Sequence, residues 1–141
     1  MIETTADMGL RIEGTKSWSE TIEQAILGLQ NFAIITQNNM ELEVSNTIIV
    51  QKTNSTGHID YERDLVRILE EIVYLNDVQD QWIVRADVTV DVESYTIYPQ
   101  VIDQKKIARS VEVKAITRHG LDVRVPVNDS ETWYAQVILD L

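Results

Sequence analysis

The fold is decided by residues 10–33, whose sequence is LRIEGTKSWSETIEQAILGLQNFA. At the start of this stretch, three residues alternate with charged ones as they do in a half-buried strand: Leu10, Ile12 and Gly14. Beyond the glycine, apolar residues recur at helical spacing: Trp18, Ile22, Ala25, Ile26, Leu29 and Ala33. Ser17 and Glu20 form a capping box for the first helix amides, so we predict a helix from about Ser17 to about Ala33.

A second helix is predicted after the polar loop at residues 53–57. Asp60 is a candidate N-cap, and the helix is expected to end near Asn76. Its apolar positions form one broad stripe: Tyr61, Leu65, Ile68, Leu69, Ile72, Val73 and Leu75. Between the two helices, four apolar residues predict a strand with a bulge near Asn46, where the alternation slips: Leu42, Val44, Ile48 and Val50.

Strands dominate the prediction for the second half of the chain. Many of its residues are β-branched and largely alternate with polar ones: Ile83, Val84, Val88, Val90, Val92, Ile97 and Val101. Val111, Val113 and Ala115 continue this pattern until Gly120 breaks it, and the segment from Leu121 onward is predicted to be a hairpin. The predicted order is β-α-β-α-β-β-β-β-β, in an α+β fold with two helices packed on a mostly antiparallel β-sheet. With 141 residues, 44% of them hydrophobic, we expect a single domain over residues 1–141.

The charge and the missing cysteines limit the possible functions. The 23 acidic and 12 basic side chains give a formal charge of −11, which repels nucleic-acid phosphates and disfavours direct nucleic-acid binding. A cation or a basic protein partner suits this charge, although acidity can also serve solubility alone. The absence of cysteine excludes disulfides and thiolate metal sites. Since the sequence shows no membrane-spanning run and no secretory signal pattern, we expect a cytoplasmic protein.

Two aspartates lie near the two ends of this sequence, Asp7 and Asp140, and the latter is followed by Leu141. If the fold brings these ends together, the two side chains and the α-carboxylate of Leu141 converge on one point and outline a hard-cation site. Calcium and magnesium prefer such oxygen ligands, whereas softer metals prefer nitrogen or sulfur. The ordinary alternatives are a turn or helix-cap role for Asp7 and a solvated strand end for Asp140.

Three separated segments resemble the motifs of the archease family. TADMG at residues 5–9 is similar to the family's N-terminal signature, usually His-Thr-Ala-Asp-Ile-Gly. VKAITRHGLDV at residues 113–123 resembles its central motif, and AQVILDL at residues 135–141 resembles its C-terminal motif. The helix after Gly14 and the YLND sequence at residues 74–77 also follow the family's order, so the resemblance spans essentially the whole chain.

The resemblance implies a non-enzymatic activator of the RtcB-type RNA ligase of tRNA splicing and RNA repair. Archeases promote guanylylation of the ligase's active-site histidine and thereby multiple turnover. The family's metal site corresponds here to Asp7, Asp140 and Leu141, and the expected cofactor is a divalent cation, calcium in the first place and magnesium as the second choice. Lys114 corresponds to a functionally important lysine of the central motif.

The other candidate residues leave alternatives open. Lys114 is either half of a cross-strand ion pair, with Glu112 close by, or a contact to a phosphate or a carboxylate of the ligase. His119 precedes a glycine and is a secondary candidate for contact with the partner, not for catalysis. Thr4 stands where the family usually has histidine, so any role of that imidazole is absent or is taken over by a hydroxyl.

Two other classes of function remain as alternatives. A metal-dependent phosphohydrolase would use Asp7 and Asp140 with Lys114 as electrophile, but the sequence shows no pair of nucleophile and base and no nucleotide-binding glycine loop. A chaperone-like interaction module would need an exposed apolar patch, which the regular amphipathic segments do not indicate. The sequence therefore favours the activator.

Overall fold

A computed structural model describes residues 7–35, 42–53, 58–79, 81–109 and 112–141. The strands are β1 (Asp7–Thr15), β2 (Ala33–Ile35), β3 (Glu43–Val44), β4 (Ile48–Gln51), β5 (Gln81–Val90), β6 (Ser94–Asp103), β7 (Ile107–Arg109), β8 (Ala115–Arg124) and β9 (Trp133–Asp140). The helices are α1 (Trp18–Gln30), α2 (Tyr61–Val78) and the short 3-10 helix η1 (Gln104–Lys106). Neither of the two described α-helices has the length and apolar character needed to cross a membrane.

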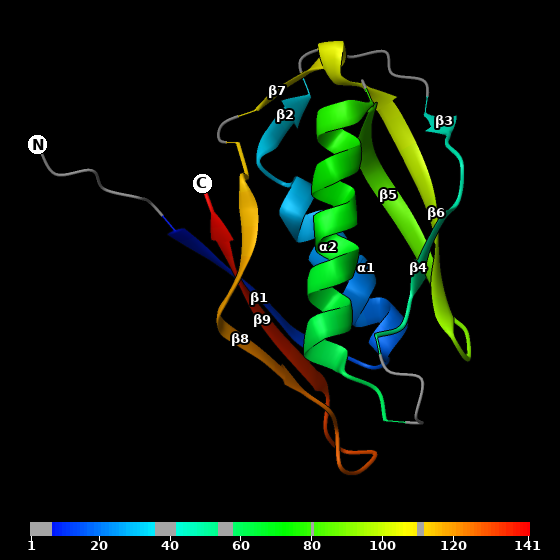
Figure 1. Ribbon diagram of the computed structural model, residues 1–141, viewed down its shortest axis with the longest axis vertical. Helices are drawn as coiled ribbons and strands as arrows, with labels where there is room; N and C mark the ends of the chain where they lie inside the picture. The colour runs from blue at the N-terminus through cyan, green and yellow to red at the C-terminus, as the bar shows by residue number, and fades with distance from the viewer. Residues whose placement is uncertain (1–6, 36–41, 54–57, 80, 110–111) are drawn as a thin grey trace, which may run out of the picture.

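The strands form three antiparallel sheets, and the two long helices lie between the larger two. Sheet A has the order β1-β9-β8, sheet B pairs β2 with β7, and in sheet C the strand β6 pairs with β5, β3 and β4. Because β3 and β4 pair with successive parts of β6, they share one of its edges and β5 takes the other. Figure 1 shows α2 in front of α1, with sheet A on the left of the helices and β5 and β6 on the right. This arrangement confirms the α+β prediction and distributes the predicted sheet over three.

The core joins the inner faces of sheets A and C to the helices. Residues from both helices and both sheets are fully buried in it: Ile22, Ile26, Leu65, Ile68, Leu69, Ile72, Ile83, Ile97 and Leu139. The predicted caps hold both helix starts, because the Glu20 amide donates to Ser17 Oγ at 3.1 Å and the Arg63 amide donates to Asp60 Oδ1 at 3.1 Å. The Glu20 carboxylate accepts from the Lys16 amide at 3.0 Å instead of from Ser17, so the capping box is shifted by one residue. Both helices therefore begin where their local sequence predicts.

The bulge predicted near Asn46 is confirmed by the strand register. Val44 pairs with Gln100, whereas Ile48 pairs with Ile97. Four steps along one strand thus match three steps along β6, which is the one-residue excess of a bulge. The slip in alternation around Asn46 therefore reflects the ladder itself.

Three predicted boundaries are wrong. Helix α1 ends at Gln30, and Ala33 begins β2 because it pairs with Arg109 of β7. Strand β8 begins at Ala115 rather than with Val113, and Val111 lies outside the described residues. The same strand runs through Gly120, whose φ of 73° belongs to a bulge and not to the strand end. In each case a pairing with a distant strand overrides the local pattern.

Candidate metal centre

Asp7 and Asp140 lie directly opposite each other in sheet A. Strand β1 pairs antiparallel with β9, and the register places Asp7 against Asp140 and Met8 against Leu139. Residues that face each other in such a ladder project from the same side of the sheet, with Cβ atoms about 4.5–5.5 Å apart. The two carboxylates can therefore reach a common ligand, as the sequence predicts.

The carboxylate pair lies on the outer face of sheet A, away from the helices. Along β9 the side chains of Ala135, Val137 and Leu139 are buried in the core. Because side chains alternate along a strand, Asp140 points to the other side, and it is only half-buried there. Asp7 is exposed beside it, so this pair faces solvent or a partner.

The central motif, residues 113–123, lies beside Asp140 where β8 begins. Ala115 of β8 is the register partner of Asp140 on the side opposite Asp7. The Lys114 amide donates to the Asp140 carbonyl at 2.7 Å. Adjacent strands β1, β9 and β8 thus bring Asp7, Asp140 and Lys114 together at one end of sheet A.

The Lys114 side chain is exposed, and it forms no ion pair with any residue that the structure describes. Glu112, two residues earlier in the same segment, is described and exposed as well. The ion-pair interpretation of Lys114 therefore finds no partner in the described parts of the chain. Only its backbone amide is placed against Asp140.

Leu141 and Gly9 complete the immediate surroundings. The Leu141 side chain is half-buried and packs against the core, which keeps its oxygens beside Asp140. Gly9 faces Ile138 across the ladder, and a Cβ at this position would lie 3.6 Å from Ile138 Cδ1, an ordinary contact. A side chain at position 9 would therefore fit against β9, so the packing of sheet A does not require glycine here.

His119 lies on a wide bulge of β8 and not at the carboxylate pair. Thr117 pairs with Ile138 and the ladder resumes with Asp122 opposite Gln136, so four residues of β8 span one residue of β9. The His119 side chain is exposed, and its carbonyl accepts a hydrogen bond from Thr117 Oγ1 at 3.4 Å. Gly120 requires glycine here, because its φ is 73° and a Cβ would lie 3.1 Å from Ile138 Cγ1. The bulge separates His119 from Asp140 along the sheet.

The donor atoms at the carboxylate pair fit a hard divalent cation. Asp7, Asp140 and Leu141 offer only oxygen, which calcium and magnesium prefer. No group of three or more His, Asp or Glu side chains able to hold a metal occurs among the described residues, so a cation here would take its other ligands from Leu141 oxygens and water. Magnesium commonly keeps several waters, and calcium accepts carbonyls and water in flexible geometry.

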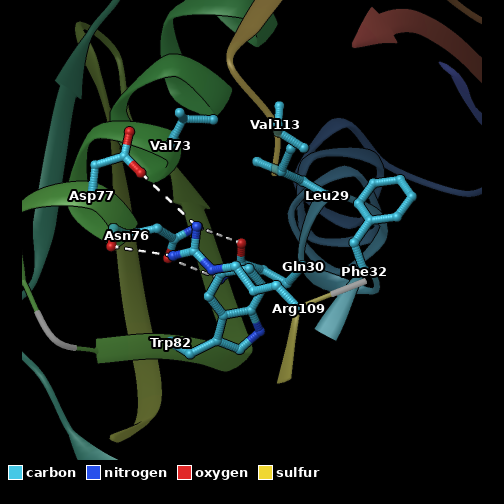
Figure 2. Close-up of a pocket in the computed structure, with 9 residues that line it drawn as sticks. All are labelled: Leu29, Gln30, Phe32, Val73, Asn76, Asp77, Trp82, Arg109 and Val113. Carbon is cyan, nitrogen blue, oxygen red and sulfur yellow. Dashed lines mark hydrogen bonds and ion pairs between the residues drawn. The ribbon is translucent and has the colours of Figure 1, made fainter. Parts of the chain in front are cut away.

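A second cluster, which the sequence does not predict, surrounds Arg109 (Figure 2). The Arg109 guanidinium lies 4.6 Å from the centroid of the Trp82 ring, and its Nη2 donates to Gln104 Oε1 at 2.9 Å and to the Asn76 carbonyl at 3.4 Å. Gln30 and Asn76 exchange two amide hydrogen bonds behind it, of 3.1 and 2.7 Å. The space they enclose, about 10 Å³, holds little more than one water molecule. This cluster therefore ties elements together and is too small for a substrate.

The comparisons with known proteins point to one family. A model of the Archease protein family (MTH1598/TM1083) matches residues 1–141. Among solved structures, the chain is similar to the solution structure of Methanobacterium thermoautotrophicum protein 1598, with a TM-score of 0.65 and 22% sequence identity over 99% of this chain and 96% of that one. No curated protein sequence matches the chain. The structural similarity supports the α+β fold.

Proposed function

The chain belongs to the archease protein family, and from this premise we propose that it is a non-enzymatic, metal-binding activator of an RtcB-type RNA ligase. In this proposal the protein promotes guanylylation of the ligase and its multiple turnover in tRNA splicing and RNA repair. The ligase supplies the chemistry, and this protein supplies an acidic, cation-bearing surface.

The observation that supports the proposal most is the meeting of three motifs at one end of sheet A. Asp7 lies opposite Asp140, and the Lys114 amide bonds to the Asp140 carbonyl. Residues from three distant parts of the chain thus form one exposed group that the core does not need. Exposed carboxylates paired across a ladder repel each other, which favours a cation as their common partner.

Asp7, Asp140 and oxygens of Leu141 would hold the cation, which we propose to be calcium, with magnesium as the second choice. A bound divalent cation supplies a concentrated positive charge that stabilises phosphate oxygens. The two aspartates anchor the charge at the outer face of the sheet, where a partner can reach it. In this proposal the exposed Lys114 side chain contacts a phosphate or a carboxylate of the ligase.

The acidic character of the chain suits such a partner. An RNA ligase must bind RNA through basic surfaces, and a protein with a formal charge of −11 is attracted to them. The same charge disfavours stable binding of this protein to the RNA itself. We therefore propose that this protein contacts the ligase itself and not the RNA.

The first prediction concerns ligase activation. Asp7→Asn and Asp140→Asn should each reduce the stimulation of ligase guanylylation and turnover by roughly tenfold or more, because each removes one of the two aspartate ligands. Asp87→Asn is the matched control, since Asp87 is an exposed carboxylate on β5, and it should stimulate as the unaltered protein does. Undiminished stimulation by both site variants would remove the carboxylate pair from the function.

Calorimetric titration with calcium and with magnesium tests the metal independently of the ligase. Binding should weaken in Asp7→Asn and Asp140→Asn and stay unchanged in Asp87→Asn. Release of phosphate from phosphate esters by the protein alone, lost in the same two variants, would favour the metal-dependent phosphohydrolase instead.

A further inference from the structure

Strand β1 is an edge strand of sheet A, and a groove runs along its open side. One side of β1 pairs with β9. On the other side, Leu10–Thr15 line a groove of about 530 Å³ whose second wall is α1. The residues of that wall are Glu20, Gln24, Leu27, Gly28 and Asn31. A groove between a strand edge and a helix has the form needed to accept one further extended strand.

The outer edge of β5 in sheet C, unlike that of β1 among the described residues, is hydrogen-bonded to a helix side chain. The Val88 amide of β5 donates to Glu23 Oε1 of α1 at 2.8 Å, so a helix side chain covers part of that edge. For Asp7–Gly14 of β1, no side chain in the described parts of the chain hydrogen-bonds to the backbone. Proteins usually blunt open edges with charged groups, proline or covering segments, and within the described residues no side chain bonds to the open edge of β1 as Glu23 does to β5.

The groove is lined mostly by polar groups, with a small apolar floor and two carboxylates. Leu10, Leu27 and Gly28 are half-buried along the floor, and a Cβ at Gly28 would come within 2.4 Å of Leu10 Cδ1, so glycine lets the leucine lie against the helix. Glu13 and Glu20 supply negative charge at the rim.

The one cation among the described residues that line the groove is turned away from the open edge. Arg11 Nη2 donates to Gln136 Oε1 of β9 at 3.3 Å, on the paired side of β1. Glu13 and Glu20 outnumber Arg11 along the groove. They are part of the formal charge of −11 of the whole chain.

We propose that the open edge of β1 and the groove beside α1 form an acceptor site for an extended, basic segment of a partner protein. The segment adds to sheet A through main-chain hydrogen bonds to β1, with alternate side chains on the apolar floor and lysines or arginines at Glu13 and Glu20. The six residues from Leu10 to Thr15 span about 20 Å, so a segment of similar length fills the groove.

A second copy of this chain is the less suitable occupant. Pairing two β1 edges would bring together two chains of charge −11 and the Glu20 side chains of two helices. The proposed site goes beyond ligase activation, because it uses neither the carboxylate pair nor a cation.

Three synthetic eight-residue peptides test the site by fluorescence anisotropy. One alternates lysine and valine, one alternates glutamate and valine, and one keeps the lysines but places proline at two central positions. The lysine–valine peptide should bind roughly tenfold tighter than both others, because only this peptide combines positive charge with an uninterrupted donor ladder. In NMR spectra of isotope-labelled protein, the amide chemical-shift changes caused by this peptide should cluster at residues 8–15 and on the groove side of α1.

Charge-reversal variants make the test local. Glu13→Lys should weaken binding of the lysine–valine peptide by roughly fivefold, whereas Glu70→Lys, an equal charge change on the exposed side of α2, should change it by less than about twofold. Circular dichroism of both variants confirms that they fold.

Four results would overturn the proposal. They are equal binding of the proline peptide, equal effects of the two variants, shift changes centred elsewhere, and a concentration-dependent dimer in sedimentation that Glu13→Lys dissolves. The last result would assign the edge to a second copy of the chain. Loss of ligase activation leaves the peptide result unchanged, so the two proposals fail separately.

Discussion

Asp64 of α2 is a wholly buried carboxylate whose two oxygens both accept hydrogen bonds. Oδ1 accepts from the Thr53 amide at 2.9 Å and from Thr53 Oγ1 at 2.7 Å, and Oδ2 accepts from the Tyr95 hydroxyl at 2.6 Å. Trp18 Nε1 donates to the same tyrosine oxygen at 3.1 Å. This network joins both helices to β6. Burial, followed by the hydrogen bond to Asp64, raises the pKa of the Tyr95 phenol above its usual range.

The raised pKa predicts a loss of stability in alkali. Above the ordinary tyrosine pKa of about 10, the unfolded chain releases the Tyr95 proton while the folded chain keeps it, so the free energy of unfolding falls as pH rises further. Tyr95→Phe should remove this part of the slope in urea unfolding curves between pH 9 and pH 11. At pH 7 it should lower the free energy of unfolding by about 1–3 kcal/mol, because Asp64 Oδ2 and Trp18 Nε1 lose their partner. Tyr98→Phe, at an exposed site, is the control, and equal slopes in both variants would contradict the assignment.

At the scale of the element, the C-terminal end of α2 depends on residues outside the helix. Its last turn contains no basic residue of its own to balance the exposed carbonyls. Gln104 Nε2 and Arg109 Nη2 both donate to the Asn76 carbonyl, and Arg109 Nη1 lies 4.0 Å from Asp77 Oδ1. Figure 2 shows the guanidinium between Trp82 and the end of this helix. The segment from η1 to β7 therefore caps α2 from a distance.

Replacing the capping arginine should destabilise the fold. Arg109→Met keeps much of the side-chain bulk but removes the donors and the charge, so the free energy of unfolding should fall by about 1–2 kcal/mol. Arg67→Met on the exposed side of the same helix should change it by less than about 0.5 kcal/mol. Urea midpoints of the two variants measure the difference, and equal midpoints would show that Arg109 does not cap α2.

At the scale of the whole molecule, sheet A carries both candidate binding sites of this acidic protein. The helices cover the inner face of the sheet, and its outer face carries Asp7 and Asp140. The groove beside β1 opens on the same sheet. One sheet thus presents the carboxylate pair at the end of its strands and an open edge along its side.

The charge of the whole molecule predicts how salt would affect its association with the proposed ligase partner. If attraction to a basic partner speeds the encounter, raising the salt from about 50 to about 500 mM should lower the association rate constant roughly tenfold or more. The dissociation rate should change much less, because short-range contacts determine it. Stopped-flow measurements give both constants, and an association rate that does not fall with salt would show that charge does not guide the encounter.

The sequence singles out the residues of the candidate site, and the structure shows which of them lie together. Asp7 and Asp140 stand out because they lie in motif-like segments, and the register of β1 with β9 places them together as expected. The sequence did not predict that Lys114 lacks an ion-pair partner among the described residues, because which charges meet across strands depends on the tertiary register. Nor does the sequence separate buried Asp64 from Asp60, a helix cap four residues earlier.

The sequence by itself determined the two helix starts, the apolar faces of both helices, the bulged strand near Asn46 and the α+β class. These features depend on caps and periodicities within a few consecutive residues, so local interactions encode them. Only the tertiary structure decided that Ala33 pairs with Arg109, that Asp7 faces Asp140, and that β1 keeps an open edge beside α1. Each of these depends on which distant strands meet when the shared core is buried, and no local pattern along the chain specifies such a partner.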